Sequence, residues 1–201
     1  MATLADKLLK SIRGKSRGSV FTTKHFLHFG TRPAVDQALS RLQRKGYIRR
    51  LGRGLYDYPK VDPRLGQLSP NPDAVAQALA SRNSSRIQVT GAQAANILGL
   101  STQVPARVVY LTDGDSKTVK IGRQTIELRR AAPRRMATAG RTSGTVIEAL
   151  RYLGKNRADD RVTSILRTTL SKEDKAALKR DTHKAPGWMR PVIEQITKAD
   201  L

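Results

Sequence analysis

Apolar positions in the first sixty residues recur at the spacing of helices. A first stripe has one apolar side chain at every fourth position and consists of Leu4, Leu8 and Ile12. Val20 and Phe21 then form a short extended run. Thr22 or Thr23 can cap a second, short helix, which Gly30 closes as a C′ residue would. The pattern therefore predicts a helix, a strand and a short helix before residue 31.

A third helix and a hairpin follow. Thr31 can cap this helix, and Pro33 lies in its first turn, where a missing backbone N–H is harmless. Its predicted buried stripe consists of Val35, Ala38, Leu39 and Leu42. Residues 47–51 and 55–58 are strand-like runs joined by a turn that contains two glycines. The order helix, strand, helix, helix, hairpin is typical of a winged helix-turn-helix domain, whose third helix can enter the DNA major groove.

The rest of the chain has a mixed pattern. The segment at 59–72, PKVDPRLGQLSPNP, holds four prolines and shows no periodicity, which favours a connection between domains. After it, strands are predicted at 87–89, 104–112, 118–121 and 124–129, with helices at 73–81, after Thr90 and from Ser143 onward. The predicted fold class is α+β. Its domains are a winged helix-turn-helix at 1–60, a linker at 61–72, and a small α+β domain at 73–201 with a helical C-terminus.

The charge balance points to a polyanionic partner. The 201 residues contain 38 Lys and Arg against 16 Asp and Glu, a formal net charge of +22 at pH 7. Residues 1–60 hold 14 basic and 3 acidic residues, and 14 minus 3 gives a net +11 for this segment. Such a field attracts nucleic acid. An anionic membrane surface is the weaker alternative, because no segment has the long basic amphipathic pattern of a surface helix.

Several classes of protein are excluded or disfavoured. The chain has no cysteine, which excludes disulfides, thiolate zinc sites and a cysteine nucleophile. No apolar run approaches the roughly 20 residues that span a bilayer, and the N-terminus lacks a secretory h-region. No P-loop, dinucleotide fingerprint or Ser-His-Asp order is found. We therefore expect a cytoplasmic protein that binds no membrane, has no cofactor and is not an enzyme.

No metal site is expected either. His25 and His28 are three residues apart, but a zinc site would need two further ligands. Asp113-Gly114 lies between two strand-like runs and is more simply a hairpin turn than part of an acidic metal site.

The third helix and the hairpin carry the candidate DNA contacts. With the apolar stripe facing the core, the opposite helix face is rich in Arg and Gln, which make paired hydrogen bonds to guanine and adenine edges. Glycines flank Arg53 at the hairpin tip and permit positive φ there, so that Arg53 projects toward a phosphate or the minor groove. The predicted DNA-binding residues are Thr23, Arg32, Asp36, Gln37, Ser40, Arg41, Arg44, Arg49, Arg50 and Arg53. An ordinary solvated face is the alternative, but such a face would usually mix Glu with Lys.

A second basic cluster follows the last predicted strand. It consists of Arg129, Arg130, Arg134 and Arg135 around Ala131-Ala132-Pro133. These four charges predict a second polyanion surface. Its partner, whether DNA phosphates, RNA or an acidic protein face, stays open.

Three sequence runs resemble a known family. The first is FTTKHFLHFGTRPAVDQALSRLQRKGYIRRLGRGLYDYPK, with its threonine-led short helix, its Arg-rich third helix and its GRGLYDYP element. It resembles the N-terminal winged-helix domain of the AbiE-type antitoxins of type IV toxin–antitoxin systems. The runs TGAQAANILGLSTQVPARVVYLTDG and IGRQTIELRRAAPRR resemble the antitoxin domain of that family. Together they cover most of residues 1–150.

The resemblance implies a transcriptional autorepressor that also neutralises a cognate nucleotidyltransferase-like toxin. Its DNA partner would be its own double-stranded operator, often an inverted repeat read by two copies, so that a homodimer forms in solution or on DNA. A protein-interaction module that sequesters a toxin and binds nucleic acid only non-specifically is the main alternative. RNA binding is a third hypothesis, which the lack of stacking aromatics among the basic residues disfavours.

Overall fold

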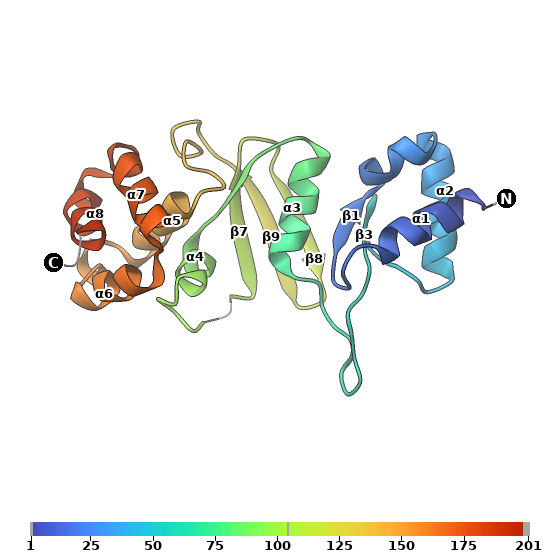
Figure 1. The fold of residues 1–201 in the computed structure, drawn as a ribbon, viewed down its shortest axis with the longest axis horizontal. Coiled ribbons are helices and arrows are strands. Elements are labelled where there is room, and N and C mark those ends of the chain that lie inside the picture. Colours follow the sequence, from blue (N-terminus) through green and yellow to red (C-terminus); the bar gives the residue numbers. More distant parts are fainter. Residues whose placement is uncertain (1, 104, 199–201) are drawn as a thin grey trace. The chain divides into compact units, whose positions relative to one another are not determined.

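The computed structural model describes residues 2–103 and 105–198, which divide into two compact units. Unit 1 comprises residues 1–84 and 119–126, and unit 2 comprises residues 85–118 and 127–201. The architecture is mixed α+β, as predicted, with N-terminal helices and a small sheet, a second sheet in the middle of the sequence, and a helical C-terminus (Figure 1).

Unit 1 has the element order of a winged helix-turn-helix. Its first elements are α1 (Leu4–Arg13), β1 (Val20–Thr22), the 3₁₀ helix η1 (Thr23–Phe29), α2 (Arg32–Arg44), β2 (Arg49–Gly52) and β3 (Leu55–Asp57). The strands form an antiparallel sheet in the order β1-β3-β2, in which Phe21 lies opposite Tyr56 and Arg49 lies opposite Asp57. The hairpin is therefore anchored by a strand that precedes both of the helices η1 and α2.

The predicted apolar stripes form the core of unit 1. Leu8 and Ile12 of α1 are fully buried, and all four predicted stripe residues of α2 are buried. Phe21 and Phe26 meet edge to face with ring centroids 5.3 Å apart. Such an aromatic pair contributes about 0.5–1.5 kcal/mol beyond the area it buries. Because α2 packs against both α1 and η1, its polar face is turned outward.

The second helix is a 3₁₀ helix that a histidine helps to cap. Thr22, one of the two predicted caps, is the N-cap residue, and its backbone N–H donates to His25 Nδ1 at 3.1 Å. Burial and neighbouring lysines lower the pKa of His25, which keeps Nδ1 available as an acceptor. Gly30 ends the helix with φ 170°, an extended conformation, so the predicted C′ role is wrong. A Cβ at Gly30 would lie 3.6 Å from Leu4 Cδ2, so the glycine gives room for the start of α1.

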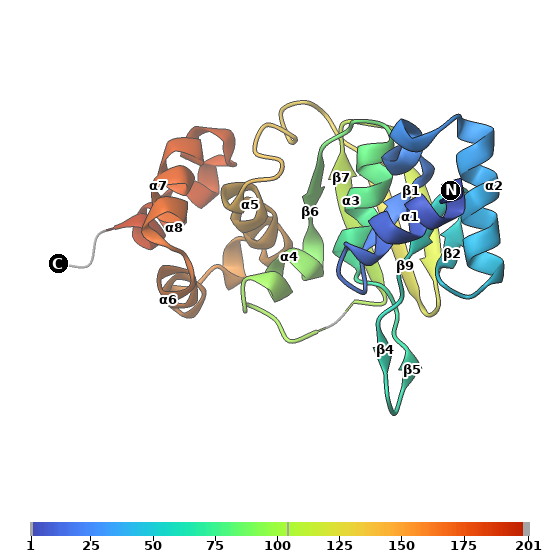
Figure 2. The same ribbon diagram turned by 45° about the vertical axis from the view of Figure 1, so that its right-hand side comes forward.

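Residues 61–84 group with unit 1, whereas the sequence predicted a linker at 61–72 and a new domain from 73. The predicted linker contains a small hairpin, β4 (Val61–Asp62) and β5 (Gly66–Gln67), which projects away from the helices of unit 1 (Figure 2). The next helix, α3 (Pro72–Arg82), packs against β1. Its buried side chains are Val75, Ala76, Ala78, Leu79 and Ala80. The prolines therefore mark turns and a helix start within one folded unit.

The strands after α3 match the predicted ones closely. They are β6 (Ile87–Val89), β7 (Arg107–Thr112), β8 (Lys117–Ile121) and β9 (Gln124–Arg130), and they form a sheet in the order β6-β7-β9-β8. The β7 strand was predicted to begin at Val104, which lies outside the described residues. Asp113-Gly114 lies in the connection from β7 to β8, where Asp113 accepts hydrogen bonds from the Arg86 backbone N–H at 2.7 Å and from its Nε at 2.9 Å.

Helices make up most of the remainder of unit 2. They are α4 (Gly91–Ile97), α5 (Thr142–Leu153), α6 (Asp160–Thr169), α7 (Lys172–Asp181) and α8 (Arg190–Thr197), with the 3₁₀ turns η2 (Lys155–Arg157), η3 (Thr182–Lys184) and η4 (Gly187–Met189). Asp159 caps α6 by accepting from the Val162 backbone N–H, and Ser171 caps α7. One apolar core joins all five α-helices, with Leu150, Leu166 and Leu178 fully buried at its centre.

Two buried carboxylates tie the helices of unit 2 to their surroundings. Glu148 of α5 accepts from Thr90 Oγ1 at 2.6 Å and from the Arg135 guanidinium at 3.0 and 2.7 Å. Asp181 at the end of α7 accepts from Ser143 Oγ at 2.6 Å and from Lys184 Nζ at 2.7 Å.

The pKa of Asp181 reflects these contacts. Burial alone would raise it, but the hydrogen bonds from Lys184, Ser143 and a neighbouring arginine lower the pKa of Asp181 from 3.8 to about 2. A depressed carboxyl pKa stabilises the folded state fully at pH values above 3.8. That contribution is lost as the pH falls through about 2.

Gly144 in α5 packs so closely against its neighbours that a larger side chain should destabilise the fold. A Cβ at this position would overlap the Thr138 carbonyl oxygen and Gln88 Oε1, and the first of these is backbone that cannot rotate away. We expect Gly144→Ala to lower the free energy of unfolding by about 1–3 kcal/mol, as overpacking does, although alanine favours helices. Urea denaturation followed by circular dichroism measures the change. Gly187→Ala is the matched control, because no atom lies within 4 Å of a Cβ there. Equal stability of the two variants would contradict the prediction.

Candidate nucleic-acid interface

The outward face of α2 carries two rows of polar side chains. By helical periodicity the first row is Gln37, Arg41 and Arg44, and the second row is Arg32, Asp36 and Ser40. All three side chains of the first row are exposed, and Arg32 is exposed at the start of the second. Six of the ten predicted DNA-binding residues therefore share one helix face. Their arrangement offers Arg and Gln donors at the spacing of a helix that reads base edges.

The carboxylate on this face is already satisfied. Thr23 Oγ1 donates to Asp36 Oδ1 at 2.7 Å, and the Arg32 guanidinium lies 3.8 Å from the other carboxylate oxygen. Thr23 itself is buried, so it does not share the exposed face of the other predicted residues. It instead links the start of η1 to α2 and thereby fixes how α2 is held. With its charge partly balanced, Asp36 repels an approaching phosphate less than a free carboxylate would.

The hairpin between β2 and β3 forms a short wing. Gly54 has φ +65°, the left-handed conformation that glycine adopts without strain, whereas Gly52 pairs with Leu55 and has no positive φ. The positive φ that was predicted for the turn is therefore found at Gly54 and not at Gly52. Arg53 at the tip is exposed, and Arg50 is exposed on β2 with its Nε donating to the Gly52 carbonyl at 3.3 Å. The wing thus presents two arginine side chains to solvent.

Arg49 has a structural role that the sequence did not predict. Its Nε and Nη2 donate to the two carboxylate oxygens of Asp57 at 3.1 and 2.6 Å, and Nη2 also donates to the Leu68 carbonyl at 2.9 Å. The Asp57 side chain is completely buried. Arg49 therefore neutralises a buried charge within unit 1, which removes it from the set of arginines that are free to contact a ligand.

Two cations near the wing were missed by sequence reasoning. Arg82 Nη1 at the end of α3 donates to the Arg53 carbonyl at 3.2 Å. Lys24 Nζ in η1 donates to the Ser81 carbonyl at 3.3 Å and to Ser84 Oγ at 3.1 Å. Residues 24 and 82 are far apart in the sequence, and no local motif signals that the fold brings them together.

The second predicted basic surface is divided by ion pairs. Arg129 donates to Glu127 at 3.0 Å, and Arg107 bonds the same carboxylate. Arg135 is held by the buried Glu148, as described above. Arg130 and Arg134 are exposed. Arg134 and Arg135 border a hollow of about 360 Å³ in unit 2 together with Arg151 and Lys184. The structure therefore brings the second pair of the predicted cluster together with two further cations, Arg151 of α5 and Lys184 of η3.

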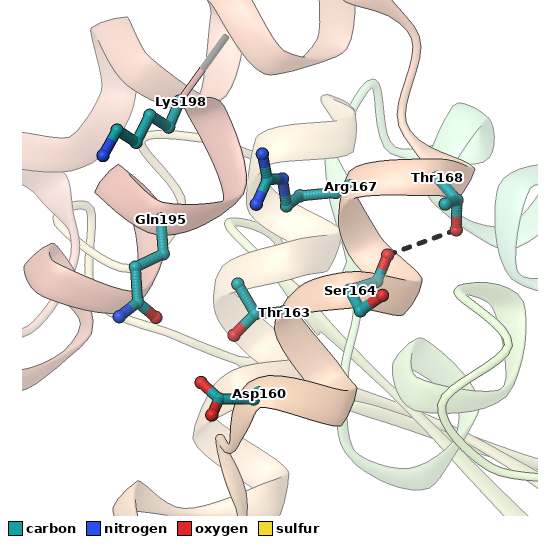
Figure 3. A pocket seen from close by; sticks show the side chains of 7 residues that line it. All are labelled: Asp160, Thr163, Ser164, Arg167, Thr168, Gln195 and Lys198. Atoms are coloured by element: carbon teal, nitrogen blue, oxygen red, sulfur yellow. Dashed lines mark hydrogen bonds between the residues drawn. The ribbon is translucent and has the colours of Figure 1, made fainter. Parts of the chain in front are cut away.

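A larger hollow of about 600 Å³ lies between α6 and the end of α8 (Figure 3). Asp160, Arg167 and Lys198 contribute charged groups to its lining. The hydroxyl of Thr168 donates to the Ser164 carbonyl at 3.2 Å, and that of Thr163 is bonded to the backbone in the same way. Both hydroxyls are therefore engaged by backbone carbonyls four residues earlier in the chain.

Two further observations concern other classes of site. Within residues 2–103 and 105–198, no three His, Asp or Glu side chains lie close enough together to hold a metal ion. Over the same ranges, none of the helices has both the length and the apolar character required to cross a bilayer.

Comparison with known proteins places the chain in a family. The fold defines an α+β protein with an N-terminal winged helix-turn-helix that exposes arginines on α2 and on its wing. The chain belongs to the family of unknown function DUF6088, whose model matches residues 7–178. Its fold is similar to that of the RV2827C protein from Mycobacterium tuberculosis, with a TM-score of 0.51 and 13% sequence identity over 100% of this chain and 84% of that chain. No match was found among curated proteins.

Removing Arg49 should damage stability more than removing its neighbour Arg50. Arg49→Ala leaves the buried Asp57 carboxylate without its partner, and we expect a loss of about 2–4 kcal/mol in the free energy of unfolding. Arg50→Ala removes the same charge from an exposed position and should change the free energy by less than about 0.5 kcal/mol. Chemical denaturation of both variants measures the difference. A similar, small effect of both substitutions would show that the buried pair does not support unit 1.

Proposed function

We propose that this protein is a sequence-specific double-stranded DNA-binding regulator. The observation that carries the proposal is the exposed Arg- and Gln-rich face of α2 beside the arginines of the wing, on a face whose carboxylate is held by Thr23. Such a face suits the major groove, and the wing suits the adjacent phosphates or minor groove. The net charge of +22 adds a long-range attraction for DNA.

The proposed mechanism is occlusion of an operator. Contacts to phosphates supply affinity and make binding strongly dependent on salt, while contacts to base edges supply specificity. Arg32, Gln37, Arg41 and Arg44 are the side chains we assign to base readout, and Arg50 and Arg53 are assigned to the backbone or the minor groove. No catalytic role is proposed. Two copies would read an inverted-repeat operator.

We further propose an antitoxin role, in which the protein represses its own promoter and neutralises a nucleotidyltransferase-like toxin. The resemblance to the AbiE-type antitoxins across most of residues 1–150 supports this role. Co-expression with a toxin encoded by the adjacent gene tests it, with growth as the readout. The alternative is an interaction module that sequesters the toxin and binds nucleic acid only non-specifically. That alternative predicts stable co-purification with the toxin and equal affinity for all DNA sequences.

Binding to the protein's own upstream DNA tests the regulatory role directly. We expect at least tenfold tighter binding to that DNA than to a length-matched random duplex at about 200 mM salt, where non-specific attraction is weakened by orders of magnitude relative to about 50 mM. Fluorescence anisotropy titrations at both salt concentrations provide the measurement. Equal affinities that fall together with salt would overturn the proposal and favour the interaction module.

Substitutions on the helix and on the wing should affect binding differently. Arg41→Ala should relax sequence preference, because it removes a donor assigned to base edges, at a cost of about 1–3 kcal/mol on the operator only. Arg53→Ala should weaken binding to operator and random DNA by about the same factor, because it removes a phosphate contact. Both side chains are exposed, so folding should be unaffected. Identical losses on both DNAs for both variants would refute this division of roles.

A further inference from the structure

The C-terminal end of α3 is joined to the wing and to η1 by polar contacts. Arg82 Nη1 donates to the Arg53 carbonyl at the wing tip at 3.2 Å. Lys24 Nζ donates to the Ser81 carbonyl at 3.3 Å and to Ser84 Oγ at 3.1 Å. These bonds satisfy carbonyls at the end of α3 and hold two cations in place beside the wing. A helix outside the winged-helix motif therefore contributes to the end of that motif where DNA is proposed to bind.

A hollow of about 300 Å³ opens where these elements meet. Three cations, Lys24, Arg32 and Arg82, line it together with Gly54 of the wing. No Asp or Glu is among the described residues that line it. Asp36, on the neighbouring face of α2, accepts from Thr23 Oγ1 and lies 3.8 Å from the Arg32 guanidinium, so it offsets part of the charge of Arg32. Lys24 and Arg82 donate to uncharged oxygens, so the hollow keeps a net positive charge that suits an anion.

The position of the hollow indicates which anion it would take. It lies between the start of α2, where Arg32 is the first residue, and the tip of the wing. Gly54 takes φ +65° and has no side chain, so the wing places only backbone at this side of the hollow. Arg offers a planar set of donors to phosphate oxygens, and Lys adds a mobile point charge.

We propose that this hollow holds a backbone phosphate of bound DNA, with Arg82 of α3, Lys24 and Arg32 as its ligands. The proposal rests on the DNA-binding function proposed above and adds α3 to the DNA-contacting surface. It assigns Lys24 and Arg82 a sequence-independent role, because a phosphate contact carries no base information.

The salt dependence of DNA binding tests this assignment in the full chain. Each phosphate contact contributes about one unit to the slope of log K against log salt. Arg82→Ala should therefore reduce that slope by about one and weaken binding about tenfold on operator and random DNA alike. Arg64→Ala is the matched control, since Arg64 is exposed on the projecting β4–β5 hairpin and the change in net charge is the same. Thermal unfolding of both variants shows whether unit 1 remains folded.

A second measurement does not depend on DNA. Inorganic phosphate titrated into the 15N-labelled wild-type chain should shift the amide resonances of Thr23, Gly54 and Asn83, and the shifts should be lost in Lys24→Gln and Arg82→Ala. If wild-type protein binds DNA while Arg82→Ala keeps the wild-type slope, this inference is overturned and the regulatory function stands. If wild-type protein shows no preference for its own upstream DNA, the regulatory function fails. The phosphate titration then shows independently whether the hollow binds an anion. Absence of phosphate-induced shifts at these amides overturns this inference.

Discussion

The bidentate pair between Arg49 and Asp57 is the interaction on which unit 1 most depends. The two residues lie opposite each other in β2 and β3, and the Asp57 carboxylate is completely buried. A buried carboxylate without a partner is strongly destabilising, so Arg49 stabilises the closed hairpin by compensating the charge of Asp57. The same guanidinium bonds the Leu68 carbonyl and thereby attaches the segment that leads into α3. One side chain, Arg49, thus links the two strands of the wing to the chain that follows them.

Buried acids are paired with basic side chains in unit 2 as well, and these pairs reduce the number of cations that are available to a ligand. Asp57, Glu148 and Asp181 are the buried acids among the described residues, and each engages at least one Arg or Lys. In a chain with a net charge of +22, such pairs fix part of the excess cations as structural bonds. The arginines of α2 and the wing tip are different, because they lie at exposed positions and the acid beside them, Asp36, is itself exposed to solvent and contacts only Arg32 among them. This contrast, rather than the total charge, marks the candidate interface.

The similarity to the RV2827C protein extends over the whole chain at 13% identity, which shows that very different sequences support this fold. What such sequences need to share is the pattern of buried positions and turns, while exposed residues are free to vary. The exposed side chains on the outward face of α2 are not needed for the fold, and under the proposed function they would determine which DNA sequence is read.

The sequence alone determined most of the elements and much of the core, because helical and strand periodicity report burial locally. The stripes on α1 and α2, the wing hairpin and the strands β6 to β9 all follow from short-range patterns. Only the tertiary structure decided that β1 pairs with β3, that α3 belongs to unit 1, and that Lys24 and Arg82 meet at the wing. It also decided which arginines are ion-paired with buried acids: Arg49 and Arg135 look like their neighbours in the sequence, yet each is held by a buried carboxylate. The physical reason is that pairing between distant charges depends on which elements pack together, and periodicity carries no information about that choice.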